Sequence, residues 1–149
     1  MSENFKEKYK NKRISAIDFG SKRCGIAVCD EFHITTKPVS VLDFSSELFW
    51  DYLTKILNIE RVSAIVIGVP HRLDEQKTEV IKQIEEFIVQ LKEKTDLEIF
   101  TFDESFSSKR ATATMLEIGT KKKKRRQKGI SDKIAACIIL KDFLNEMEN

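Results

Sequence analysis

The sequence predicts an α/β domain with a mixed sheet, and three observations lead to this prediction. Two strand-like runs lie within ISAIDFGSKRCGIAV, residues 14–28, on either side of a turn that contains Gly20. Further along, short apolar runs alternate with segments of helical periodicity. The chain has 149 residues, the size of one ordinary domain, so we expect residues 13–149 to form a single domain.

The composition fits a globular protein that does not span a membrane. Hydrophobic residues make up 41% and charged residues 34%, and no apolar run approaches the roughly 20 residues of a membrane helix. Residues 1–12 are polar and lack the apolar segment of a signal peptide, so we expect a disordered tail and a cytoplasmic protein. The three cysteines form no CxxC pair and lie in apolar runs, which predicts buried, reduced thiols rather than a zinc site.

After the opening hairpin, the sequence predicts a third strand and then a helix. The third strand is ITTKPVSVL, residues 34–42, and Pro38 places it at a sheet edge or interrupts it, because proline cannot donate to a ladder. Residues 44–58 change to helical spacing, with Ser45 or Ser46 as the candidate N-cap. We assign Trp50, His33 and His71 no functional role: the tryptophan packs, and the histidines are surface loop residues.

The next three elements are a strand, a helix and a strand. Residues 63–69, SAIVIGV, form a continuous apolar run, which is typical of a central parallel strand covered on both faces. A helical stripe over residues 78–92 precedes a strand at residues 97–102.

Two helices complete the prediction. Ser107 or Ser108 caps a helix that ends at Gly119, and Ser131 caps a largely buried final helix.

Three acids belong to elements that should meet at one edge of this sheet. Right-handed crossovers bring the carboxyl ends of the parallel strands together, and ligands of open α/β sheets bind there. Asp18 ends the first strand, Glu104 follows the last, and Asp132 opens the final helix. Converging carboxylates repel one another unless a cation offsets their charge. Two Mg²⁺ or Mn²⁺ ions roughly 4 Å apart would activate a water and stabilise the departing 3′ oxygen of a phosphodiester, which indicates nuclease chemistry.

Simpler roles exist for two of these acids. Asp18 could serve only to initiate the hairpin turn. Asp132 could serve only to interact favourably with the dipole of the final helix.

A cationic block, KKKKRRQK at residues 121–128, stands out from the charge distribution. Seven of the 26 Lys and Arg residues lie in it, so the rest of the chain carries 19 basic against 24 acidic residues. Such a block is typical of polyanion binding, although a solvated loop without a specific role is the alternative. The predicted substrate-binding cations of the block are Lys121, Lys122, Lys123, Lys124, Arg125 and Arg126.

Four blocks of the sequence, in their order and spacing, resemble the YqgF/RuvX family of pre-16S rRNA nucleases, which is related to Holliday-junction resolvases. They are IDFGSKRCGIAV, AIVIGVP, FDESFSSKRATATML and GISDKIAACIIL, and the likeness extends over about residues 13–146. The resemblance implies an RNase H-like fold, with five strands in the order 3-2-1-4-5, strand 2 antiparallel and helices on the flanks. It also implies that Asp18, Glu104 and Asp132 match the catalytic acids, and that Lys22 and Arg23 match a basic pair. Ser105 stands where the family usually carries arginine.

These observations lead to one principal expectation and two alternatives. We expect a two-metal endonuclease that processes the 5′ end of precursor 16S rRNA in ribosome biogenesis. It would bind precursor rRNA or a ribosomal particle, with the basic residues holding the backbone without reading sequence. The first alternative is a resolvase of four-way DNA junctions, which would need a two-fold dimer, whereas the sequence favours a monomer. The second is a non-catalytic RNA-binding assembly factor.

Overall fold

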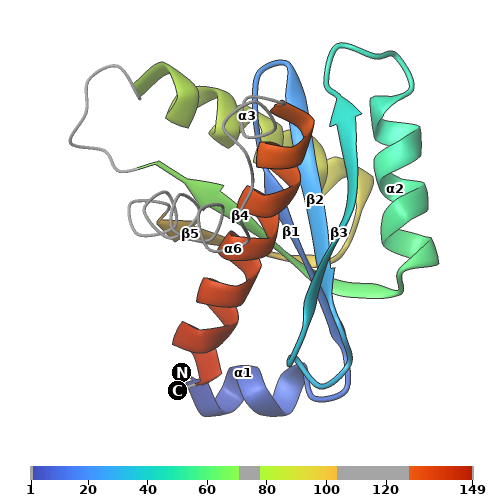
Figure 1. Ribbon diagram of the computed structural model, residues 1–149. Helices are drawn as coiled ribbons and strands as arrows, with labels where there is room; N and C mark the ends of the chain where they lie inside the picture. The colour runs from blue at the N-terminus through green and yellow to red at the C-terminus, as the bar shows by residue number, and fades with distance from the viewer. Residues whose placement is uncertain (1, 71–77, 104–127, 149) are drawn as a thin grey trace.

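The computed structural model of the chain describes residues 2–70, 78–103 and 128–148, and it contains a twisted sheet between two layers of helices (Figure 1). Within these residues no helix is both long and apolar enough to span a bilayer. The strands are β1 (Arg13–Asp18), β2 (Arg23–Cys29), β3 (Thr36–Asp43), β4 (Val62–Val69) and β5 (Glu98–Asp103). The helices are α1 (Ser2–Lys8), α2 (Phe49–Ile59), α3 (Thr78–Lys94) and α6 (Lys128–Glu148).

The strand order is β3-β2-β1-β4-β5, which confirms the predicted mixed sheet. β2 runs antiparallel to both of its neighbours, whereas β1, β4 and β5 are parallel. The carboxyl ends of these three strands therefore lie at one edge of the sheet. Pro38 lies in the edge strand β3, where the register with β2 shifts between Ile26 and Ala27, as the sequence predicts.

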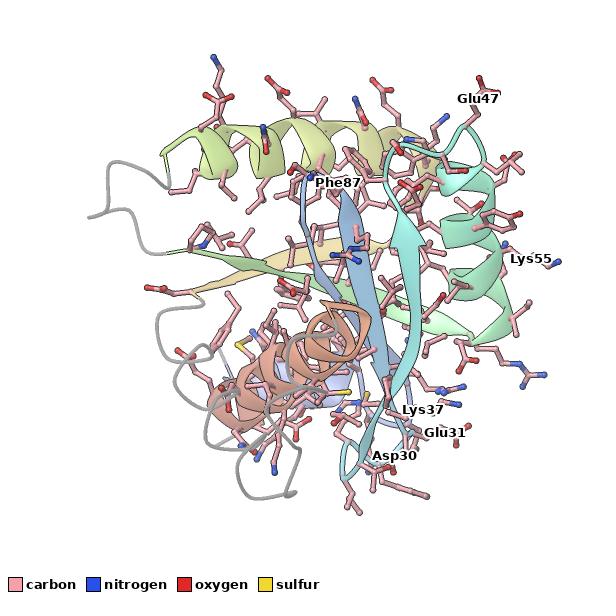
Figure 2. All side chains as sticks on the ribbon, turned by 45° about the horizontal axis from the view of Figure 1, so that its top comes forward. Asp30, Glu31, Lys37, Glu47, Lys55 and Phe87 are labelled. Atoms are coloured by element: carbon pink, nitrogen blue, oxygen red, sulfur yellow. The ribbon has the colours of Figure 1, made fainter. Side chains whose placement is uncertain are left out.

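Helices α2 and α3 cover one face of the sheet. Side chains such as Phe49, Leu53 and Phe87 pack there against Ile17 of β1. Trp50 stacks on Phe87, with ring centroids 5.3 Å apart and planes at 21°, which confirms its packing role. In Figure 2, Phe87 points from α3 toward the sheet, whereas the labelled charged side chains at and before α2 point outward.

Helices α1 and α6 cover the opposite face. The expected disordered tail is wrong for Ser2–Lys8, which forms α1. Phe5 and Tyr9 are 4% and 3% exposed, because their spacing of four residues brings both rings onto one side of the segment. The ring centroid of Phe5 lies 5.5 Å from that of Phe143 and 5.6 Å from that of Phe100, and both pairs meet edge to face.

Two helices begin elsewhere than expected. α2 begins at Phe49 rather than near Ser45, because the preceding residues form turns in which Ser46 Oγ accepts a hydrogen bond from the Leu48 N–H at 3.2 Å. The final helix begins at Lys128, so Ser131 is an internal residue of α6 and not its cap.

The side chain of His33 is largely buried, whereas the sequence predicts a surface loop residue. Its side chain is 6% exposed, its Nδ1 contacts the Glu148 carboxylate, and its Nε2 lies 2.6 Å from the Lys12 carbonyl oxygen. The residue lies in the β2–β3 connection and has a φ of 58°. His71 and the helix expected at residues 107–119 lie outside the described residues.

The cysteines are reduced and at least partly buried, as predicted. Burial raises the pKa of the Cys29 thiol to about 11.

Candidate metal and nucleic-acid site

Asp18 ends β1 at the edge of the sheet where the parallel strands end, and its side chain lies on the face covered by α6. The alternation along β1 establishes this face. Ile17 packs into the core under α2 and α3, while Ala16 packs into the core under α6, so Asp18 shares the side of Ala16. The residue is half-buried. Its carboxylate therefore lies at the rim of the α6 face.

Glycines flank Asp18 on both neighbouring strands. Asp18 pairs directly with Gly25 of β2, and the pairing of Ile17 with Ile67 places Gly68 of β4 beside it on the other side. Adjacent strands lie about 4.8 Å apart, so a side chain at either position would stand against the carboxylate. The positions directly beside Asp18 on the two neighbouring strands therefore carry no side chain. Sequence reasoning missed this feature, because it depends on the register between strands.

The other two predicted acids belong to segments that lead to the same edge. Asp103, the residue before Glu104, ends β5 opposite Val69, the last residue of β4. Asp132 lies one turn into α6, and Figure 1 shows the first turns of this helix toward the end of the sheet where β1 ends. Glu104 lies outside the described residues, and only the backbone position of Asp132 is described.

No cluster of three metal-binding side chains occurs among the residues that the structure describes. Of the predicted acidic triad, that part of the chain includes only the side chain of Asp18. The three acids as a set of metal ligands thus stay a prediction.

The predicted basic pair follows Asp18 in the turn between β1 and β2. Lys22 is exposed, and Arg23, the first residue of β2, is half-buried. Arg23 shares the α6 face with Gly25 and Asp18, because Cys24 between the two β2 residues packs into the opposite core. The guanidinium group and the Asp18 carboxylate therefore belong to the same corner of the molecule. The cationic block at residues 121–127 lies outside the described residues.

Gly20 allows the tight path of this turn. A Cβ atom at Gly20 would lie 2.5 Å from the carbonyl oxygen of Arg23, closer than such atoms approach one another. Because the obstructing atom belongs to the backbone, no side-chain rotation could relieve the contact. Gly20 therefore allows the Arg23 carbonyl oxygen to approach the chain closely in this turn.

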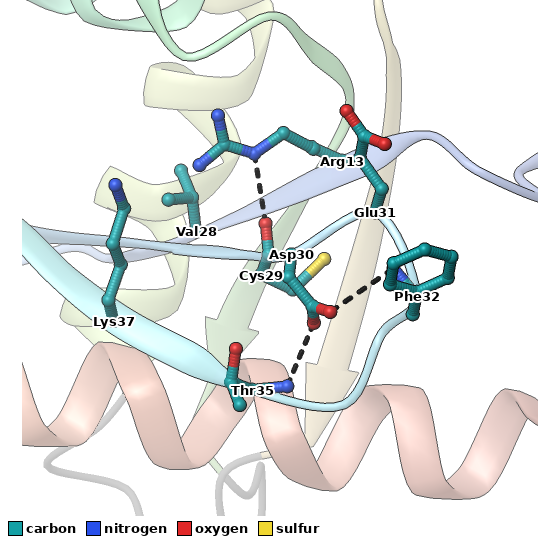
Figure 3. A pocket seen from close by; sticks show the side chains of 8 residues that line it. All are labelled: Arg13, Val28, Cys29, Asp30, Glu31, Phe32, Thr35 and Lys37. Atoms are coloured by element: carbon teal, nitrogen blue, oxygen red, sulfur yellow. Dashed lines mark hydrogen bonds between the residues drawn. The ribbon is translucent and has the colours of Figure 1, made fainter.

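A pocket of about 360 Å³ lies at the other end of β2 (Figure 3). Arg13 Nε donates to the Cys29 carbonyl oxygen at 3.1 Å, and Arg13 also forms an ion pair with Glu60 at 2.8 Å. Burial would raise the pKa of Asp30, but hydrogen bonds from backbone N–H groups, including those of Thr35 and Ile34, hold it below the usual value. These interactions fix the β2–β3 connection, and we assign the pocket a structural role.

Comparison with known proteins places this arrangement in a family. The RuvX family, described as Holliday junction resolvase, matches residues 12–146. A protein of Bacteroides fragilis named "Putative pre-16S rRNA nuclease" is 41% identical over 133 residues, covering 89% of this chain and 95% of that protein. Proteins of the same name from Amoebophilus asiaticus and Flavobacterium psychrophilum are 39% and 37% identical, each over 89% of this chain and over 94% and 96% of their own lengths.

Solved structures share the fold at much lower identity. The chain resembles Thermus thermophilus RuvC, solved with a Holliday junction substrate, with a TM-score of 0.56 and 14% identity over 91% of this chain and 96% of that one. A Fowlpox virus resolvase in complex with junction DNA gives a TM-score of 0.55 and 10% identity, over 92% and 99% of the two chains. The fold is therefore the RNase H-like fold of RuvC-like resolvases. With a family match over nearly all of its length, the chain belongs to the RuvX (YqgF) family.

Proposed function

We propose that this protein is a divalent-metal-dependent endonuclease that hydrolyses phosphodiester bonds in structured RNA. The substrate we favour is precursor 16S rRNA, cut at its 5′ end during ribosome biogenesis in the cytoplasm. The observation that carries the proposal is the position of Asp18, a carboxylate at the carboxyl end of β1 between two glycines. The relatives named as pre-16S rRNA nucleases support the choice of substrate.

Asp18, Glu104 and Asp132 would hold the metal. The surroundings of Asp18 fit this role, because carboxylate oxygens are the donors that Mg²⁺ and Mn²⁺ prefer. Gly25 and Gly68 bring no side chain that would occupy the space next to this carboxylate. A bound pair of such ions would supply an activated water and stabilise the departing 3′ oxygen.

The cations of the chain would bind and orient the substrate. Arg23 lies on the same face as Asp18, and Lys22 is exposed in the turn between them. Both would contact phosphate oxygens, which position the RNA without reading its sequence. The six cations from Lys121 to Arg126 would extend this contact along the backbone, so binding should weaken steeply as salt is raised.

A cleavage assay on precursor 16S rRNA tests the proposal. The purified protein is incubated with the RNA and Mg²⁺ or Mn²⁺, and the 5′ ends of the products are mapped. We expect discrete cleavage that requires the metal and is absent from Asp18→Asn. If the wild-type protein and Asp18→Asn leave the RNA equally intact under both metals, the nuclease proposal is wrong.

A junction resolvase is the second candidate, because the matching family is described as Holliday junction resolvase. It would use the same acids but cut two strands symmetrically, which requires an isologous dimer. We favour a monomer. Sedimentation at micromolar concentration with and without a four-way DNA junction separates the two candidates: a stable dimer that nicks junctions symmetrically would favour the resolvase.

A non-catalytic assembly factor would bind RNA with the same salt dependence as a nuclease. Calorimetric titration with Mn²⁺ distinguishes these two functions. The nuclease should bind Mn²⁺ and lose that binding in Asp18→Asn, whereas an assembly factor has no need of ions at the carboxylates.

A further inference from the structure

We propose that Asp43 is a positioning residue, which holds the Arg23 guanidinium group beside Asp18 for contact with the phosphate backbone. The inference rests on the proposed function, since it requires a nucleic acid at the Asp18 end of the sheet. Asp43 is the last residue of β3, far from Asp18 in the sequence and two strands away in the sheet.

The register of three strands aligns these residues on one face. Arg23 pairs with Asp43 across β2 and β3, and Asp18 pairs with Gly25 across β1 and β2. Because Arg23 and Gly25 are two residues apart, they share a face of the sheet, and Arg23 is a diagonal neighbour of Asp18. Such neighbours have Cα atoms about 7 to 8 Å apart, which is within reach of a long side chain. Arg23 thus stands between Asp18 and Asp43.

The Asp43 carboxylate is itself held in place. Its Oδ1 accepts hydrogen bonds from the Ser45 hydroxyl at 2.6 Å and from the Ser45 N–H at 2.9 Å. The Ser45 hydroxyl, the Ser45 N–H and the charge of Arg23 all lower the pKa of Asp43. A fixed, ionised carboxylate opposite Arg23 can orient the guanidinium group.

Two further contacts join the β1–β2 turn to the segment that follows β3. The Phe44 N–H donates to the Lys22 carbonyl oxygen at 2.8 Å. The rings of Phe19 and Phe44 meet edge to face, with centroids 5.1 Å apart. The turn that carries the basic pair and the loop that carries Asp43 therefore form one unit, so Asp43 keeps a constant position relative to Arg23.

Positioning and simple electrostatics predict opposite effects of removing Asp43. An acid near a phosphate-binding surface repels RNA, so its loss should tighten binding if charge is all that matters. An arginine held in its binding orientation loses less rotamer freedom when it meets a phosphate, so loss of its partner should weaken binding. The sign of the change therefore decides between the two.

The experiment measures the affinity of a fluorescein-labelled RNA hairpin with a single-stranded 5′ extension, by anisotropy in EDTA over a range of salt. Asp43→Asn is the test variant, because Asn keeps the Oδ1 acceptor for Ser45 and loses the charge. We expect binding roughly three- to fivefold weaker than wild type, as for the loss of an exposed ion pair. Glu47→Gln is the matched control: it removes an exposed acid from the same loop and should not weaken binding.

A double-mutant cycle assigns the effect to Arg23. Arg23→Gln should weaken binding and reduce the slope of log K against log salt by about one. In that background Asp43→Asn should have no further effect. The proposal is overturned if Asp43→Asn binds as tightly as wild type or tighter, or if it weakens binding equally when Arg23 is absent.

A second variant leaves the Asp43–Ser45 hydrogen bonds intact, in case Asp43→Asn lowers the melting temperature. Arg23→Lys keeps the charge but loses the planar fork that can contact Asp43 and a phosphate at the same time, so it should also weaken binding. Unchanged affinity of Arg23→Lys counts against the proposal. A wild-type protein that binds the hairpin but cuts no precursor RNA refutes only the nuclease function, whereas one that binds no RNA refutes both.

Discussion

The two ends of the sheet differ in the exposure of their side chains and in the contacts that these side chains make. At the end where β1 finishes, Asp18 is flanked by glycines, and Lys22, Arg23 and Asp43 lie nearby with at least part of their side chains exposed. At the other end, polar and aromatic side chains contact one another closely. Four rings form a cluster there: Phe5 of α1, Tyr9 in the turn after α1, Phe100 of β5 and Phe143 of α6.

This difference indicates a division between chemistry and stability. Under the proposed function, the Asp18 carboxylate contacts a metal and the Arg23 guanidinium group contacts a phosphate, so substitutions at these residues should affect catalysis more than folding. The buried rings and the His33 contacts with Glu148 and Lys12 contribute to folding, and the proposed function does not use them. Substitutions at the two ends should therefore separate loss of activity from loss of stability.

The largest expected effect is that of Asp18→Asn at the site end. We expect cleavage to fall by more than about a hundredfold, because losing even an outer partner of a metal ligand typically costs 10- to 100-fold. The melting temperature should change little. Initial rates with Mn²⁺ and thermal unfolding measure the two quantities, and Asp51→Asn in the first turn of α2 is the charge-matched control. If Asp18→Asn and Asp51→Asn lose the same fraction of the cleavage rate, the proposed division between chemistry at one end of the sheet and stability at the other is wrong.

Phe5→Ala tests the opposite end. Removing this ring, which is 4% exposed, should lower the free energy of unfolding by about 3 to 5 kcal/mol. The rate per folded molecule should remain that of wild type. Urea unfolding and a cleavage assay at a temperature where the variant is folded check both results. Phe32→Ala, at a ring that is 71% exposed, should change stability by less than about 0.5 kcal/mol.

Gly20→Ala should lower both stability and the rate of cleavage. The added Cβ would force the backbone at Arg23 to move, at a cost of about 1 to 3 kcal/mol. Because the same turn separates Asp18 from Arg23, cleavage should fall as well. Ser21→Ala, at an exposed neighbour, should leave stability and rate near wild type. A fully active Gly20→Ala protein would mean that the turn has no part in forming the site.

The smallest expected effect concerns pH and the α1 contact with β5. The Tyr9 hydroxyl donates to Glu98, and this bond, together with Lys8, lowers the pKa of Glu98. A lowered native pKa stabilises the fold above the unfolded value of about 4.3, and that stability is lost as the pH falls through the native value. Tyr9→Phe should therefore flatten the loss of stability below about pH 5.

The change in the free energy of unfolding caused by Tyr9→Phe should be below about 1 kcal/mol, because the Glu98 side chain is 43% exposed and its charge is screened by solvent. Urea unfolding across the acid range measures it. Tyr52→Phe, at a hydroxyl on the exposed side of α2, should leave the pH dependence unchanged. If Tyr9→Phe and the wild-type protein lose stability equally as the pH falls, the hydrogen bond between Tyr9 and Glu98 does not stabilise the packing of α1.

Much of the fold was predictable because local patterns encode it. The apolar run at 63–69 and the stripe at 78–92 gave a central strand and a helix close to β4 and α3. The helix start near Ser45 was wrong because its signal, a serine before an apolar segment, also occurs in turns. The prediction of a disordered tail is wrong for Ser2–Lys8 because Phe5 and Tyr9, isolated among charged residues, give no compositional sign of burial.

The candidate site was predictable only in part. Asp18 was identified because it ends a strand and begins a turn, both of which are local features. The roles of Glu104 and of the cationic block stay predictions. Asp43 could not be identified, because its relation to Arg23 exists only across two paired strands.

By itself, the sequence determined the order of the five strands and of α2, α3 and α6, the position of Asp18 at the end of the first strand, and membership of the RuvX family, because each depends on residues close together in the chain. Tertiary structure decided which residues share a face: the glycines beside Asp18, the Arg23–Asp43 pair, and the packing of α1 on α6. The physical reason is that a one-residue change of register would move every side chain of a strand to the other face, and register is set by contacts between distant segments.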